Sequence, residues 1–96
     1  MKIAMVIGST VSTMKDEGLN GRKLLILRAA DTTGQPAGEP FVAVDTVSAG
    51  TGDLVLVLEG SSARFTNTTK DAPVDATIVG VIDSLEEKGK VTFRKS

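Results

Sequence analysis

The stretch LVLVLEGSSAR, Leu54–Arg64, places five consecutive aliphatic residues directly before a turn. A strand with one face in water alternates apolar and polar side chains, and Leu54–Leu58 does not. The stretch therefore predicts a strand covered on both faces, followed by a turn at Gly60. It leaves open what covers the second face, and whether the serines after Gly60 take part in chemistry.

Four further apolar segments flank this run, separated by turns rich in glycine and proline. They span Ile3–Val11, Leu24–Ala29, Phe41–Val47 and Ala76–Ile82. Short strands at this spacing are typical of a small all-β barrel or sandwich. A turn at Gly89 followed by the alternating segment Val91–Arg94 predicts a final short strand. Residues 61–73 are polar and begin with a serine that can cap a helix, so one short helix is expected there. Residues 1–96 are expected to form one domain.

Composition excludes several kinds of chemistry. The chain has 96 residues, with 11 basic against 12 acidic side chains, and contains no Cys and no His. It therefore has no thiolate, which serves as a nucleophile and metal ligand in many proteins, and no imidazole, which is the commonest general base and metal ligand. No apolar stretch is long enough to span a membrane, and the first apolar run is too short for a secretory signal. We expect a cytoplasmic protein with no metal, no cofactor and no membrane partner.

The doubly apolar strands predict self-association. Leu24–Leu27, Leu54–Leu58 and Ile78–Ile82 carry aliphatic residues on both faces, whereas a small barrel has one interior and hides only one face. Leaving one leucine side chain exposed forgoes about 1.5–3 kcal/mol. A second copy of the chain is the favoured cover, and coverage by the short helix and long loops is the alternative.

The turn Gly60–Arg64 has the position of a nucleophile elbow, but it lacks the second glycine of that motif and no histidine is present. It also lacks the lysine of a phosphate-binding loop. The favoured interpretation is a turn at Gly60, a serine cap and an ion pair of Arg64, with no catalytic residue. Asp45 stands inside an apolar segment and is expected to be buried and paired, with an arginine such as Arg64 or Arg28.

A small barrel of this kind is also compatible with the OB fold, which often binds nucleic acids. Single-strand binding by that fold needs a basic groove and aromatic stacking platforms. The chain is nearly neutral and has only Phe41, Phe65 and Phe93 as aromatic residues. A nucleic-acid or anion-binding module is therefore the alternative function, and it is not the favoured one.

Three ordered blocks resemble the EutN/CcmL family, the pentameric vertex proteins of bacterial microcompartment shells. They are Val44–Leu56 (VDTVSAGTGDLVL), Gly60–Arg64 (GSSAR) and Pro73–Asp83 (PVDATIVGVID). Gly8–Val11 and Gly21–Leu25 extend the resemblance over nearly the whole chain.

This resemblance implies an all-β, five-stranded OB-like barrel with one short helix, assembled as a cyclic homopentamer. Such rings are thought to fill the corners where layers of hexameric shell proteins bend to close a carboxysome or metabolosome shell. The ring is a head-to-tail assembly, so each copy offers two different surfaces.

Site residues also follow from the resemblance. The stretch Ser48, Ala49, Gly50, Thr51, Gly52, Asp53 is expected to line the central opening of the ring, with an ordinary tight turn as the alternative. The residues Gly60, Ser61, Ser62, Ala63, Arg64, Asp45 and Asp75 are expected to serve structure and subunit contact. Ser48 stands where many relatives have glycine or alanine.

Overall fold

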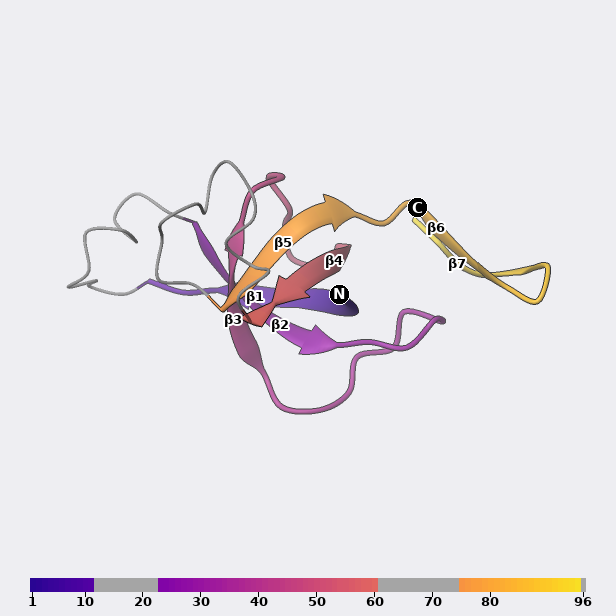
Figure 1. The fold of residues 1–96 in the computed structure, drawn as a ribbon, viewed down its shortest axis with the longest axis horizontal. Coiled ribbons are helices and arrows are strands. Elements are labelled where there is room, and N and C mark those ends of the chain that lie inside the picture. The colour runs from indigo at the N-terminus through magenta and orange to yellow at the C-terminus, as the bar shows by residue number, and fades with distance from the viewer. Residues whose placement is uncertain (12–22, 61–74, 96) are drawn as a thin grey trace.

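The structure is a computed structural model that describes residues 1–11, 23–60 and 75–95. Five strands close into a barrel in the order β1-β2-β3-β5-β4, and a separate hairpin follows (Figure 1). The barrel strands are β1 (Lys2–Ser9), β2 (Leu24–Ala29), β3 (Phe41–Asp45), β4 (Leu54–Glu59) and β5 (Ala76–Val81). The hairpin strands are β6 (Ser84–Glu87) and β7 (Lys90–Arg94).

Closure of the barrel depends on two pairings between strands distant in the sequence. β1 pairs with β4 in antiparallel register, and β3 pairs with β5 in parallel register. Bulges interrupt β1 between Val6 and Gly8 and β4 between Leu56 and Val57. Such bulges increase local bend and twist, which a small closed barrel requires. The predicted OB-like five-stranded barrel is confirmed.

The barrel core consists of small and medium aliphatic side chains. Strand β4 contributes Val55 and Val57 to the core, and neither has any exposed surface. The neighbouring strand β1 contributes Ala4 and Val6. The remaining buried members are Leu25, Leu27, Ala43, Ala49, Ala76 and Ile78. A narrow barrel can be filled only when residues of this size alternate along its strands.

The second face of Leu54–Leu58 is only partly covered by this chain. Leu54 is 1% exposed, whereas Leu56 and Leu58 remain partly exposed. Leu56 lies opposite Ile3 of β1 on one side and Gly80 of β5 on the other. Gly80 has no side chain to cover the leucine, although a Cβ there would lie at an ordinary contact distance of 3.8 Å from the leucine Cδ1.

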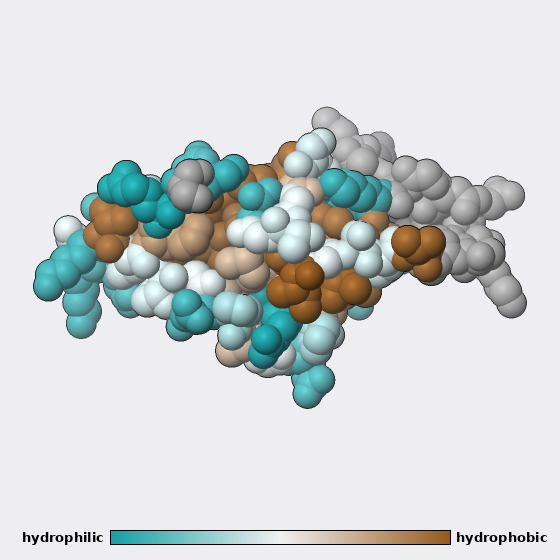
Figure 2. Space-filling view, turned by 180° about the vertical axis from the view of Figure 1, so that it is seen from behind, coloured by the Kyte–Doolittle hydropathy of each residue, from teal (hydrophilic) through white to brown (hydrophobic). Residues whose placement is uncertain are grey.

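An apolar surface continues from Leu56 across β1, β2 and β3. Ile3 lies beside Leu56, and Ile26 pairs with Val42, which is 45% exposed. We call these outward-facing residues the outer apolar stripe: Ile3, Met5, Ile7, Ile26, Val42 and Leu56. Hydrophobic residues reach the surface of the barrel between hydrophilic ones in Figure 2. As predicted for Leu24–Leu27 and Leu54–Leu58, strands β2 and β4 have one aliphatic face in the core and aliphatic residues on the other face that are partly exposed.

The hairpin β6–β7 projects from the barrel along the long axis of the molecule (Figure 1). Its turn contains Lys88 and Gly89, both with positive φ, as a tight two-residue hairpin turn requires. Phe93 packs against Gly34, where a Cβ would lie 2.7 Å from the ring. Glu87 Oε2 accepts a hydrogen bond of 2.7 Å from the Thr32 hydroxyl. The hairpin is therefore fixed to the segment that follows β2.

The turn at Gly89 and the last strand were predicted, whereas β6 was not. The helix predicted within residues 61–73 lies outside the described residues. Within the parts of the chain that the structure describes, no helix is long and apolar enough to cross a membrane.

Candidate functional site

The stretch Ser48–Asp53 forms a compact loop between β3 and β4. Asp53 closes the loop through two hydrogen bonds to Gly50. The Asp53 Oδ2 accepts one of 2.9 Å from the Gly50 N–H, and the Asp53 N–H donates one of 3.0 Å to the Gly50 carbonyl. The loop is also joined to β1, since Gly52 N–H donates to Val6 O and Val6 N–H donates to Asp53 O, both at 2.9 Å. Thr51 and Gly52 are exposed at its tip.

A second set of contacts holds the other end of this loop. The Asp45 side chain is 1% exposed, and its Oδ2 lies 3.4 Å from Lys23 Nζ. The same ammonium donates a 2.8 Å hydrogen bond to the Ala49 carbonyl, and Asp45 Oδ1 accepts one of 3.0 Å from the Val47 N–H. Lys23 therefore ties the end of β3 to the loop, and we call Lys23, Asp45 and Ala49 the lysine latch.

The prediction of a buried, paired Asp45 is confirmed, but Arg28 as its partner is wrong. Strand register explains the difference, because Leu24 pairs with Val44 and the Asp45 N–H donates to the Lys23 carbonyl at 2.9 Å. Arg28 lies near the far end of β2, where its Nε donates to the Gly38 carbonyl at 3.0 Å. The other proposed partner, Arg64, lies outside the described residues.

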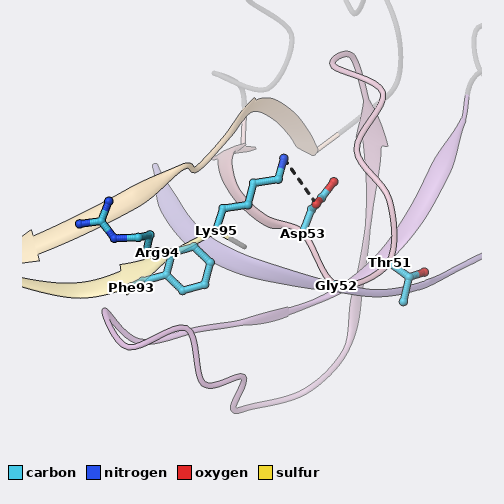
Figure 3. Close-up of a pocket in the computed structure, with 6 residues that line it drawn as sticks. All are labelled: Thr51, Gly52, Asp53, Phe93, Arg94 and Lys95. Atoms are coloured by element: carbon cyan, nitrogen blue, oxygen red, sulfur yellow. Dashed lines mark ion pairs between the residues drawn. The ribbon is translucent and has the colours of Figure 1, made fainter.

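A shallow pocket separates the loop from the base of the hairpin (Figure 3). Its lining residues are Thr51, Gly52, Asp53, Phe93, Arg94 and Lys95. Lys95 extends toward Asp53, with 3.9 Å between Nζ and Oδ1, whereas Arg94 points the opposite way. The loop and the end of the chain thus meet at one charged pair, which nothing in the sequence spacing indicated.

Gly60 and Asp75 meet at the other end of the barrel. The Gly60 N–H donates a 2.8 Å hydrogen bond to the Asp75 carbonyl, and Gly60 has a φ of 64°. That backbone conformation favours glycine, so the predicted turn at this residue has a physical basis. Ser61, Ser62, Ala63 and Arg64 of the same motif lie outside the described residues.

The charged side chains of this region make contacts within the chain. No group of three or more acidic side chains among the described residues is placed to hold a metal ion. The lysine latch and the Asp53–Lys95 pair are structural contacts that order a loop. The geometry therefore defines a small OB-type barrel with an ordered loop at one end and an apolar outer face.

Comparisons with known proteins agree with this class. The family described as "Ethanolamine utilisation protein EutN/carboxysome" matches residues 1–83. The microcompartment shell vertex protein EutN of Salmonella typhimurium is 42% identical over 99% of this chain and 96% of its own. The carboxysome shell vertex protein CcmL of Synechocystis is 46% identical over 99% of this chain and 95% of its own.

A solved structure extends the comparison to assembly. The GrpN pentameric microcompartment shell protein from Rhodospirillum rubrum superposes with a TM-score of 0.81 at 42% identity, covering 91% of this chain and 99% of that one. The chain belongs to the EutN/CcmL family of bacterial microcompartment shell vertex proteins.

Proposed function

We propose that five copies of this chain form a ring that occupies a vertex of a bacterial microcompartment shell. The observation that carries the proposal is the outer apolar stripe, which leaves aliphatic side chains of four strands partly uncovered in the single chain. Partly exposed aliphatic side chains on several neighbouring strands are typical of a protein–protein interface. The pentameric relative GrpN supports five as the number of copies.

The function of such a ring is geometric. A layer of six-fold units cannot close on itself without five-fold points, so a ring of five supplies the curvature at each corner. Docking onto hexameric shell proteins is part of this proposal, and no catalytic step and no nucleic-acid partner are assigned. The net charge of −1 agrees with a protein that has no polyanionic partner.

We place the exposed part of the Ser48–Asp53 loop around the central opening of the ring, whereas the Ala49 side chain, 1% exposed, packs in the barrel core. The exposed tip of the loop carries Thr51 and Gly52, and small residues allow five backbones to approach closely. The lysine latch and the Asp53 contacts would keep each copy of the loop in the same conformation. The residues Gly60 and Asp75 belong to the subunit framework in this arrangement.

Native mass spectrometry of the intact chain tests the ring directly. We expect the mass of five copies at micromolar concentration, whereas a monomer or dimer would contradict the proposal. Ile7→Glu places a carboxylate in the outer apolar stripe and is expected to yield monomers with an intact barrel by circular dichroism. Ile7→Val is the matched control and should leave the ring unchanged.

A further inference from the structure

A pocket with a volume of about 430 Å³ lies where strands β1, β3 and β5 begin and β4 ends. We call it the acidic pocket, because three of its lining residues are the carboxylates Glu39, Glu59 and Asp75, whereas Lys2 is its one cation. Three negative charges against one positive give the lining a net charge of −2, in a chain whose total charge is −1. Negative charge is therefore concentrated at this place.

The acidic pocket already holds one ammonium group, which the chain itself supplies. Lys2 Nζ lies 3.0 Å from Glu59 Oε2 and 4.0 Å from the centre of the Phe41 ring. A carboxylate and the face of an aromatic ring both attract ammonium and guanidinium groups. The contacts of Lys2 thus show the chemistry that this pocket accommodates.

Two further carboxylates of the pocket have no such cation. Glu39 and Asp75 are exposed, and neither side chain is in an ion pair within the described ranges. Like charges that line one pocket repel each other, and a bound cation relieves that repulsion. Glu39 and Asp75 are therefore suited to hold a cation that comes from outside the chain.

The acidic pocket also has an apolar surface between its charges. Pro40 and Val42 are exposed there, and Phe41 is half-buried. An apolar centre with a charged rim is the usual composition of a contact between proteins. A ligand that fits both features carries an aliphatic side chain between basic ones.

The hairpin of another copy does not have this composition. In the register of β6 against β7, Lys90 lies opposite Glu87, and Val91 lies opposite Glu86. Each of these β7 residues thus has a carboxylate beside it, which Glu39 and Asp75 would repel. The charge of the pocket therefore favours a different protein as its occupant.

We propose that the acidic pocket docks an extended segment of a different protein, in which two basic residues flank an aliphatic one at alternate positions. Residues two apart in an extended segment lie on the same face, so all three side chains can reach the pocket. Glu39 and Asp75 bind the two cations, and Pro40 and Phe41 contact the aliphatic side chain. This inference goes beyond the proposed ring, because it does not depend on the number of copies.

Fluorescence anisotropy of a labelled peptide tests the docking on the intact protein. The probe is Arg-Ala-Val-Ala-Arg, and the control peptide Gln-Ala-Val-Ala-Gln has the same spacing without the charges. We expect the probe to bind at low salt and the control peptide not to bind. Binding of the probe should weaken when the salt concentration is raised to about 1 M, because ions screen exposed charge pairs.

Variants of the pocket locate the binding. Glu39→Gln with Asp75→Asn removes both free charges and should weaken binding of the probe about threefold to tenfold. Asp83→Asn with Glu86→Gln is the matched control, since it changes the net charge equally at exposed positions outside the pocket. This control should leave the affinity unchanged.

The outcomes separate this inference from the ring. Equal binding of the two peptides, an equal loss in the two double variants, or no binding to the unmodified protein would each overturn it. If Glu39→Gln with Asp75→Asn changes the number of copies in native mass spectrometry, the pocket belongs to a contact between copies, and the inference is also wrong. An unmodified chain that is not a pentamer contradicts only the proposed function, since the pocket lies within a single chain.

Discussion

Ser48 and Gly52 both adopt positive φ, at 59° and 94°, although only one of them is a glycine. For a residue with a Cβ, this conformation costs about 1–2 kcal/mol. Replacement by glycine removes this cost from the folded state, but it also raises the conformational entropy of the unfolded chain, which cancels part of the gain in stability. Ser48→Gly is therefore expected to stabilise the fold by about 0.5 kcal/mol.

Urea unfolding measures this change. Gly52→Ala is the matched variant in the same loop and should destabilise by about 1–2 kcal/mol, because no atom lies within 4 Å of the new Cβ and only the backbone conformation matters. Equal effects of the two substitutions would show that backbone conformation is not the controlling factor in this loop.

Lys23 carries the next prediction, because it is the cation beside the buried Asp45 carboxylate. Lys23→Met keeps the length of the side chain and removes the ammonium, leaving the carboxylate with the Val47 N–H as its remaining described partner. We expect a loss of about 1–3 kcal/mol in the free energy of unfolding.

A double-mutant cycle with Asp45→Asn checks the assignment, since the loss from Lys23→Met should be smaller in that background. Lys23→Arg serves as the control that keeps the charge. Additive effects of the two substitutions would contradict the latch.

We expect Asp31 to make the stability of the chain pH-dependent in acid. Hydrogen bonds from the Thr33 hydroxyl, at 2.6 Å, and from the Gln35 and Thr33 N–H groups lower the pKa of its carboxyl in the folded state. A carboxyl with a lowered folded pKa stabilises the fold above its unfolded pKa, near 4, and this contribution is lost as the pH falls through the folded value.

Unfolding experiments between pH 2 and about pH 7 test this. Asp31→Asn should flatten the stability curve below about pH 4 relative to the unmodified chain. A curve of unchanged slope would show that Asp31 does not contribute to the acid dependence.

At the scale of elements, the hairpin depends on one close approach. The Phe93 ring lies over Gly34, whose φ is 85°, so a methyl group there is strained by the backbone and meets the ring at 2.7 Å. Gly34→Ala is expected to release the hairpin from the barrel while leaving the barrel strands folded. Hydrogen exchange should show faster exchange of β6 and β7 amides, and unchanged protection in β6 and β7 would refute the role of this contact. The control Gly38→Ala shares the positive φ but meets nothing within 4 Å.

The elements could be predicted to different extents from the sequence. The five barrel strands follow from aliphatic runs and turn residues, and the burial of Val55 and Val57 is what an aliphatic run predicts. β6 was missed because Ser84–Glu87 has one apolar residue, Leu85, and its strand conformation comes from pairing with β7. The partner of Asp45 was missed because it depends on the register of β2 against β3, which no local pattern encodes.

At the scale of the whole molecule, assembly should appear in thermal unfolding. If folding and ring formation are linked, the midpoint temperature rises with protein concentration, because association stabilises the folded state by mass action. Ile7→Glu should remove this dependence, whereas Ile7→Val should retain it. A midpoint that does not vary over a hundredfold range of concentration would contradict the linkage.

The attachment of the hairpin also has a mechanical consequence. The base of this arm is fixed at Asp83, whose carbonyl accepts a 2.8 Å hydrogen bond from the Lys95 N–H, and at Asp53 through the Lys95 side chain. A movement of the arm would therefore displace Lys95 relative to Asp53, and Asp53 is also the residue whose carboxylate closes the Ser48–Asp53 loop. The Lys95 side chain is one of two links between the arm and that loop, the other being the 2.8 Å hydrogen bond from the Ile82 N–H to the Leu54 carbonyl.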